Sequence, residues 1–300
     1  MWLRWLTTSP LDAVRDGRAI GEPGARMVVI IAMAFGAAVL EAWLRGEPGV
    51  LRAVAGLVVQ QRRRTLAGDR LLTLLGVVGV ALAATLAGAV LPIQGPAVLD
   101  SSVGIVWFNA MEVGVWVAVW LVGWGVNAVF PLVGGYRFVA QGLAYELPHM
   151  FALITVALGA GSLRFADIVA AQRPVWFVVW MPVAFLVYLL SALAMAFWGP
   201  FGEALGRDIA GGVAGELGGV DRLVFSGGRY LMLAVSAAAA VPLFLGADWA
   251  PAKTALVLAG LVLVRQLVPG VRMDRYMTFA WMVLIPATLV QMLIVGIVVL

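Results

Sequence analysis

Three ionisable side chains lie in apolar surroundings and are the clearest candidates for proton chemistry. Glu112 lies in the stretch WFNAMEVGVW, and Glu146 and His149 lie together in AYELPHM. An ionisable group at the centre of a bilayer costs about 2.5–3.5 kcal/mol on insertion scales, so each needs a partner, water or a function. Because buried carboxyls and histidines exchange protons readily near neutral pH, these residue types indicate proton movement inside a membrane.

Each of these residues also has a purely structural interpretation. Glu112 can be a neutral acid that hydrogen-bonds to Asn109 or to the backbone, instead of a proton-relay station. His149 can be a hydrogen-bonded packing residue near a kink at Pro148, instead of a proton carrier beside Glu146. Pro148 frees a backbone carbonyl within its helix, which adds a polar group near Glu146. The sequence leaves both interpretations open.

A cationic side chain, Arg137, precedes Glu146 on the same stretch. If both belong to one helix they are about 13.5 Å apart along its axis, so direct pairing is not expected. A water chain or an acid from another helix is the expected partner of each.

Redox and metal chemistry carried by this chain itself is excluded by composition. The sequence has no cysteine and one histidine, which leaves no thiolate, no iron–sulfur ligand set and no imidazole cluster for a metal or haem. Nucleotide-binding glycine motifs and a Ser-His-acid order are also lacking. We therefore assign no catalytic or metal-binding residue, and we expect any electron-carrying cofactor to lie on a partner.

The elements that position these residues are membrane-spanning helices. The chain has 300 residues, of which 63% are hydrophobic and 12% are charged, about half the charged share of a soluble domain. Stretches long enough to span a bilayer are expected at 27–43, 71–92, 104–130, 138–161, 174–198, 229–247, 253–269 and 276–299. The predicted fold is an all-α polytopic membrane protein, with a surface segment at 1–26 and one transmembrane domain at 27–300.

Basic residues predict the orientation of these spans. Most of the 20 Lys and Arg residues fall in the segments 44–70, 131–137, 199–229 and 265–275, which are therefore expected on the cytoplasmic side of the cell inner membrane. The net charge of +4 is explained by these membrane ends, so nucleic acid is not an expected partner.

The two long cytoplasmic segments differ in character. In 44–70, Pro48-Gly49 opens an apolar run with helical spacing that ends at Arg62-Arg63-Arg64, a pattern typical of an amphipathic helix lying in the membrane interface. The segment 199–229 is rich in glycine and carries Asp208, Glu216 and Arg229. It is either a flexible linker or a folded loop that docks a soluble partner.

Several motifs occur in a specific order along the chain. They are Trp124, Asn127, Leu132 to Gly135, Arg137, Ala140-Gln141, Tyr145-Glu146-Leu147-Pro148, Gly161-Ser162-Leu163 and Asp167-Ile168-Val169, with a weaker set from Arg272 through Asp274-Arg275 and Trp281 to Pro286. This order resembles the H-subunit family of complex I (NADH-quinone oxidoreductase), which includes related membrane subunits of energy-converting hydrogenases. The resemblance implies a membrane subunit that joins a quinone-reducing arm to a proton-pumping arm.

The resemblance implies roles for charged residues. Glu146 and Glu112, the loop acids Asp208 and Glu216, Glu41 and His149 become proton-coupling candidates, while Arg137 and Arg229 become structural or loop charges. It also implies soluble Fe–S or hydrogenase-like partners and antiporter-like membrane partners. Quinone would bind at an interface, and no quinone-binding residue is assigned in this chain.

This sequence departs from the family pattern at several of these positions. Gly211 to Ala214 and Val224 stand where the family carries acids, and His149 stands where it usually has an apolar residue. The chain is thus a divergent member by resemblance. It is expected to be a subunit without redox centres, and three alternatives remain: a scaffold that has lost proton coupling, a subunit of a hydrogenase-type complex that does not use quinone, and a secondary transporter.

Overall fold

A computed structural model gives the fold of this chain and describes residues 18–47, 49–93 and 95–299. Helices account for all its regular structure within those residues. Eight of them are long and apolar enough to cross a membrane, as the composition predicts. Their bounds are Arg26–Leu44, Arg70–Ala89, Gly104–Gly125, Val129–Ala160, Pro182–Phe201, Gly219–Leu245, Ala250–Leu267 and Met273–Val299.

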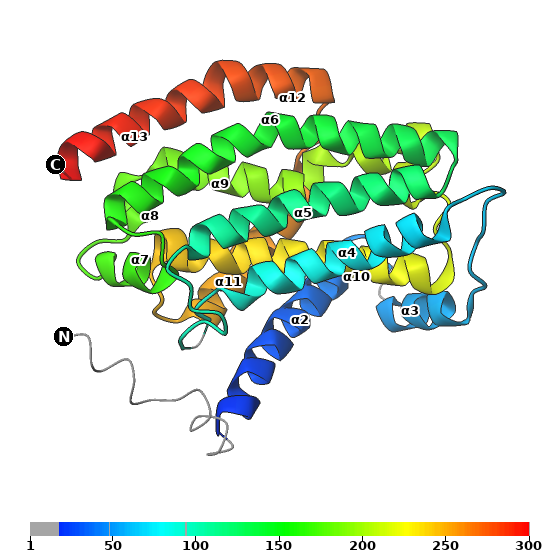
Figure 1. Cartoon of the computed structure of the whole chain (residues 1–300), viewed down its shortest axis with the longest axis horizontal. Coiled ribbons are helices and arrows are strands. Elements are labelled where there is room, and N and C mark those ends of the chain that lie inside the picture. The colour runs from blue at the N-terminus through cyan, green and yellow to red at the C-terminus, as the bar shows by residue number, and fades with distance from the viewer. Residues whose placement is uncertain (1–17, 48, 94, 300) are drawn as a thin grey trace.

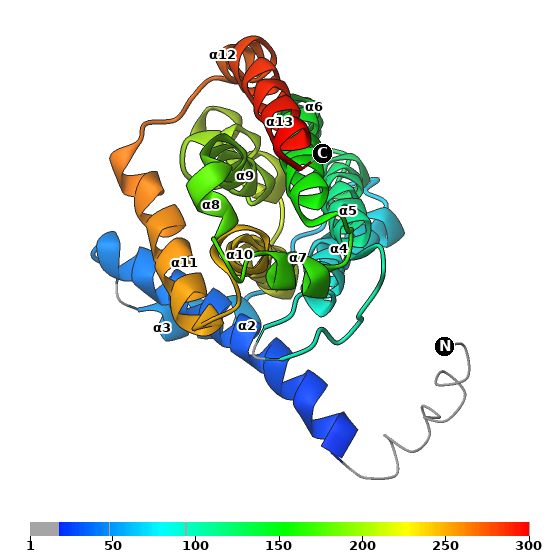
Figure 2. The same cartoon turned by 90° about the vertical axis from the view of Figure 1, so that its left-hand side faces the viewer.

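Helix α10 (Gly219–Ala240) is the central element of the bundle (Figure 2). In its apolar window 78% of the residues are buried, against 22% in the span that ends the chain. It contacts α4 (Arg70–Ala89), α9 (Pro182–Met195) and α11 (Ala250–Leu267). The row of small side chains from Ala237 to Ala240 is fully buried, which lets these neighbours approach closely.

A layer of two long helices carries the acids of interest. Helices α5 (Gly104–Gly125) and α6 (Val129–Ala160) pack side by side, and α4 lies against α5 on one side (Figure 1). The C-terminal helices α12 (Met273–Phe279) and α13 (Ile285–Val299) run along α6 and are joined by a π-helical turn. This arrangement places the middle of α6 between α5, α9 and α13.

Helix α2 (Arg18–Leu44) is inclined steeply to the other long helices (Figure 1). Its C-terminal part packs against α10 and α11, while much of its length is exposed. Of the predicted surface segment 1–26, residues 1–17 lie outside the described residues, and α2 already begins at Arg18.

Two boundaries differ from those predicted from hydropathy. The predicted cytoplasmic loop 131–137 does not form, because α5 ends at Gly125 and α6 begins at Val129 after a tight turn in which Asn127 has φ 49°. Arg137 is therefore a helical residue. Hydropathy averaging missed the turn because apolar residues continue through it on both sides.

The glycine-rich segment 199–229, predicted as one loop, is a loop only in its first part. Its second part belongs to α10, which places Arg222 and Arg229 on a helix. Its first part folds into short 3-10 turns at Gly199–Phe201, Glu203–Leu205, Arg207–Ile209 and Gly212–Ala214. Because side chains such as Ala204 and Val213 are fully buried, this is a folded loop and not a flexible linker.

The predicted span 174–198 is interrupted near its start. A short helix α8 (Phe177–Trp180) ends at Met181, and α9 begins at Pro182. Proline suits the first turn of a helix because it lacks the N–H that would be unpaired there.

Helix α3 (Val50–Val59) forms where the amphipathic pattern predicts a helix, and none of its residues is buried.

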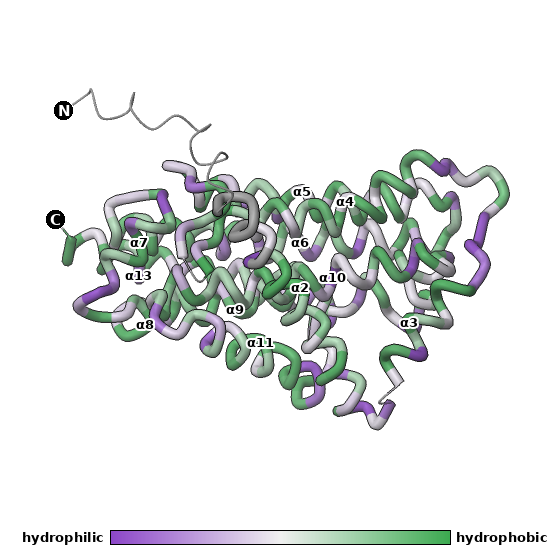
Figure 3. The backbone as a smooth tube through the Cα atoms, turned by 90° about the horizontal axis from the view of Figure 1, so that it is seen from below, coloured by the Kyte–Doolittle hydropathy of each residue, from purple (hydrophilic) through white to green (hydrophobic). Residues whose placement is uncertain are grey.

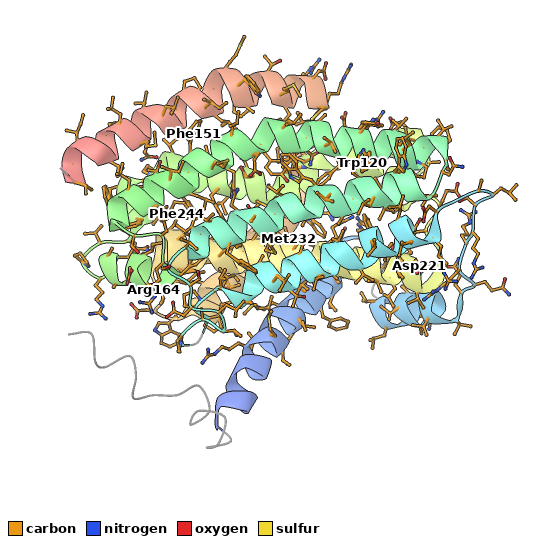
Figure 4. The ribbon with its side chains drawn as sticks, viewed as in Figure 1. Trp120, Phe151, Arg164, Asp221, Met232 and Phe244 are labelled. Carbon is orange, nitrogen blue, oxygen red and sulfur yellow. The ribbon has the colours of Figure 1, made fainter. Side chains whose placement is uncertain are left out.

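Polar residues concentrate at the two ends of the bundle. Figure 3 shows hydrophobic residues along most of each long helix and hydrophilic stretches in the connections. Figure 4 shows Arg164 near one end and Asp221 near the other, with Met232 of α10 between them. The fold thus has an apolar middle of the kind a bilayer requires.

Candidate functional site

The three buried ionisable residues meet where α5 and α6 pack together. Asn109 and Glu112 lie one turn apart on α5, and Glu146 and His149 lie one turn apart on α6, so each pair faces the same way. Asn109 Nδ2 donates a hydrogen bond of 2.9 Å to Glu146 Oε1. Nε2 of His149 lies 2.8 Å from Oε2 of Glu112. We call these four residues the carboxyl–histidine cluster.

The cluster is enclosed by the protein. The side chains of Glu112 and His149 are 0% exposed and Glu146 is 8% exposed. Glu112 and His149 are close enough to form an ion pair when the ring is protonated, although neither side chain has a hydrogen-bond partner by geometry in the described protein. Glu146 Oε2 and Asn109 Oδ1 have no hydrogen-bond partner in the described protein. Unpaired buried polar atoms of this kind are typical of functional sites or of places that hold water.

Aromatic residues hold the cluster in place. The ring of Tyr188 from α9 packs against the His149 imidazole with 5.3 Å between ring centroids. The Tyr188 hydroxyl donates to the Ser236 carbonyl oxygen at 2.8 Å, which fixes that ring between α9 and α10. At the same α5–α6 contact, Trp116 Nε1 donates to the Tyr145 hydroxyl at 2.6 Å.

Glycines allow α5 and α6 to approach this closely. A Cβ atom added to Gly142 would lie 2.5 Å from Cε2 of Trp116, and one added to Gly123 would lie 2.7 Å from the Pro131 carbonyl oxygen. Real Cβ atoms do not tolerate such distances, so both positions require glycine. The spacing between the acids of α5 and α6 therefore depends on these two contacts.

Arg137 pairs with an acid of the folded loop, as expected for a partner outside its own helix. Its Nη2 lies 2.8 Å from Oδ2 of Asp208, and its Nη1 donates to the Glu203 carbonyl oxygen at 3.3 Å. The Arg137 guanidinium lowers the pKa of the Asp208 carboxyl, mainly through their hydrogen bond. Glu203 in turn accepts a hydrogen bond of 3.1 Å from the Met273 backbone N–H, which ties the loop to the start of α12.

The two predicted cytoplasmic segments contact each other. Glu216 lies 3.5 Å from Arg63, and Asp221 lies 3.6 Å from Arg62. Gln60 Oε1 accepts a hydrogen bond from the Gly219 N–H at 3.3 Å. A pocket of about 210 Å³ opens between these segments and the adjoining ends of α4 and α5.

Glu41 is the centre of a separate buried charge cluster. Its side chain is 2% exposed and pairs with Arg45 and with Arg265, whose Nη1 lies 2.5 Å from Glu41 Oε1. The Tyr230 hydroxyl donates to its other oxygen. Arg229 stacks over the Trp198 ring, with 4.7 Å from its guanidinium carbon to the ring centroid. We call Glu41, Arg45, Arg265 and Tyr230 the Glu41 cluster.

The structure thus distributes the predicted site residues over four places. Glu112, Glu146 and His149 meet in one cluster, whereas Asp208, Glu216 and Glu41 pair with arginines elsewhere. Asn109 bonds to Glu146 and not to Glu112, for which the sequence suggests it as a partner. No group of three His, Asp or Glu side chains in the described part of the chain is arranged to hold a metal ion.

Arg265 and Tyr230 are site residues that sequence reasoning missed. In the sequence, Arg265 counts only among the basic residues of 265–275 that predict the orientation of the spans. It also falls inside the apolar stretch 253–269. An arginine in such a stretch needs a buried partner, and that requirement was the available signal. Nothing in the sequence distinguishes Tyr230 from a packing tyrosine.

Comparison with known proteins identifies the family of this chain. The model of the NADH dehydrogenase family matches residues 46–296. The chain is 33% identical over 275 residues to an H subunit of the NADH-quinone oxidoreductase of Geobacter metallireducens, covering 84% of this chain and 83% of that protein. It is 32% identical over 271 residues to the corresponding H subunit of Geobacillus kaustophilus, covering 84% and 81%. The chain therefore belongs to the H-subunit family of complex I, whose members are membrane subunits of NADH-quinone oxidoreductase.

Proposed function

We propose that this chain is the membrane anchor and coupling subunit of a complex I-like assembly in the cell inner membrane. It would hold a soluble Fe–S module at its cytoplasmic face, contact antiporter-like membrane subunits, and link redox events to proton movement. The observation that carries the coupling role is the carboxyl–histidine cluster, with two acids and the single histidine enclosed at the α5–α6 contact.

The docking role is supported by the paired cytoplasmic segments. The folded loop is anchored through Arg137 and Asp208 on one side and through Arg63 and Glu216 on the other. Such anchoring gives the loop a defined surface before a partner arrives, so little ordering entropy is lost on association. A flexible linker would not offer this advantage.

The coupling chemistry available here is electrostatic. Negative charge that arrives on a reduced quinone or on a partner's cluster increases the proton affinity of a carboxyl in a low-dielectric site. A proton then enters the carboxyl–histidine cluster, and it leaves when the negative charge is removed. This chain supplies the proton-holding groups, and quinone is a substrate bound at an interface with partner subunits.

The test is coupled turnover of the purified assembly reconstituted in vesicles. Glu146→Gln keeps the size of the side chain and removes its ability to ionise, so we expect proton movement per electron pair to fall by several-fold. Thr155→Val on the same helix is the control, because the Thr155 hydroxyl donates only to the Phe151 carbonyl of its own helix. Unchanged proton movement in Glu146→Gln would favour a scaffold without a coupling role.

Copurification tests the anchoring role separately. Affinity purification of the tagged chain is expected to recover Fe–S subunits and further membrane subunits in fixed ratio. Recovery of the chain as a lone polypeptide from gently solubilised membranes would contradict the anchoring role and favour a transporter.

A further inference from the structure

We propose that His149 is the protonated counter-cation of Glu112, so that these two residues form a fixed ion pair while Glu146 alone takes up and releases the exchanging proton. This inference rests on the proposed coupling function and assigns different roles to the residues of the carboxyl–histidine cluster. His149 is then a positioning residue, and Glu146 is the residue whose charge changes during turnover.

The Glu112–His149 pair is fully buried. Both side chains are 0% exposed, and their nearest charged atoms are 2.8 Å apart, the separation of an N–H cation and a carboxylate oxygen in contact. A bare carboxylate in this position would be strongly destabilised, and an imidazolium directly against it offsets part of that cost. Imidazole is also the stronger base of the two in water, and a carboxylate oxygen 2.8 Å away favours keeping the proton on the ring.

The titratable groups around His149 come from three helices. Glu112 faces it from α5, Glu146 lies one turn away on α6, and Tyr188 packs against it from α9. Tyr145 lies on α6 next to Glu146. Two carboxyls are the acidic groups that act on this imidazole, and their negative charge favours the charged ring.

The two acids of the cluster have different partners. Glu112 has a cation as its partner, and its charge is held by that contact. Glu146 has a neutral amide as its partner, and this is the difference between the two acids, because Glu112 Oε1 and Glu146 Oε2 both have no hydrogen-bond partner in the described protein. A carboxyl that receives a hydrogen bond on one oxygen and has the other free can gain a proton without breaking that bond. Glu146 is also the more exposed of the two acids, at 8% against 0% for Glu112.

Protonation of the ring is measured directly on the full chain. The sequence contains one histidine, so 15N-histidine labelling of the chain in lipid nanodiscs, with a purification tag free of histidine, gives one pair of ring nitrogen signals. At pH 7 we expect both nitrogens to be protonated in the unmodified chain and in Glu146→Gln, and a neutral ring in Glu112→Gln. A neutral ring in the unmodified chain, or a charged ring in Glu112→Gln, would overturn the proposal.

Single and double substitutions of His149 and Glu112 in the assembled complex test the functional role of the pair. His149→Leu leaves Glu112 without its cation, and Glu112→Gln leaves the ring without its anion, so each is expected to lower coupled turnover several-fold. The double variant removes both buried charges together. We expect it to recover at least half of the coupled turnover that each single substitution loses. Thr155→Val serves again as the control on α6.

The outcomes separate the fixed pair from the function on which it rests. Loss of coupling in Glu146→Gln with no recovery in the double variant would refute the fixed pair and leave the coupling function standing. Retention of coupling in Glu146→Gln would refute the coupling function itself, whatever the charge of the ring. The protonation state of His149 is read out without turnover, so it distinguishes an ion pair from a merely structural contact.

Discussion

Arg137 and Asp208 form an ion pair of 2.8 Å between the N-terminal half of α6 and the folded loop that precedes α10. Arg137 also binds the Glu203 backbone, so one side chain joins the helix to two successive turns of that loop. The same helix carries Glu146 farther along its length. A rigid helix that touches the folded loop at one end and carries the buried acids at its middle gives a physical connection between them.

The Arg137–Asp208 pair is expected to control the order of the folded loop. Arg137→Gln and Asp208→Asn should each increase backbone amide exchange over residues 203–214 and reduce recovery of soluble subunits. Both substitutions remove the ion pair, and Arg137→Gln also removes the hydrogen bond to the Glu203 carbonyl oxygen, so Arg137→Gln should have the larger effect. The double variant should be no worse than Arg137→Gln alone. Arg207→Gln, at an exposed neighbouring position, is the control, and an equal effect there would contradict the role of the pair.

Removal of the Glu41 carboxylate is expected to be severe. Glu41→Gln leaves Arg265 and Arg45 without their shared anion, and breaking a buried ion pair from one side typically costs about 3–5 kcal/mol of folding free energy. The measurement is the yield and thermal unfolding midpoint of the chain in nanodiscs. Glu47→Gln, at an exposed position after α2, should change neither, and a stable Glu41→Gln protein would show that the arginines find other partners.

Gly142 is expected to tolerate no side chain. Gly142→Ala places a methyl group against the Trp116 indole, and overpacking of this kind costs about 1–3 kcal/mol. We expect a lower thermal unfolding midpoint and altered Trp116 fluorescence, since the indole must shift and its hydrogen bond to Tyr145 must lengthen. Gly260→Ala in α11 is the control, because a Cβ there meets nothing within 4 Å.

An ion pair at the other end of the bundle predicts a pH dependence. Arg164 Nε donates to Asp100 Oδ1 at 2.8 Å, and this hydrogen bond lowers the pKa of the Asp100 carboxyl below its ordinary value of 3.8. A carboxyl with a lowered pKa in the folded state stabilises it above the ordinary value, and this contribution is lost as pH falls through the folded value.

The measurement compares thermal unfolding midpoints across pH. Asp100→Asn and Arg164→Gln should be less stable than the unmodified chain at pH 7, and the difference should vanish as the pH falls well below 3.8. Arg173→Gln, which changes an exposed arginine nearby, should show no such convergence. A difference that stays constant as the pH is lowered through this range would rule out the ion pair as its source.

Hydropathy and charge in the sequence were sufficient to predict the class of fold. Each of the eight predicted spans has a helix in the structure, because a bilayer requires runs of apolar residues whose length can be read directly. The residues at which the helices begin and end were less predictable. The turn at Asn127 and the start of α10 at Gly219 depend on backbone conformation and on packing against other helices, and neither leaves a mark in local hydropathy.

The sequence alone determined which residues carry charge into the membrane, and only the tertiary structure decided their partners. Glu112, Glu146 and His149 stand out by type, since ionisable groups are rare in apolar stretches. That Glu112 meets His149, Asn109 meets Glu146 and Glu41 meets Arg265 follows from how the helices cross and rotate about their axes. Those contacts join residues far apart in the chain, so local sequence patterns cannot encode them.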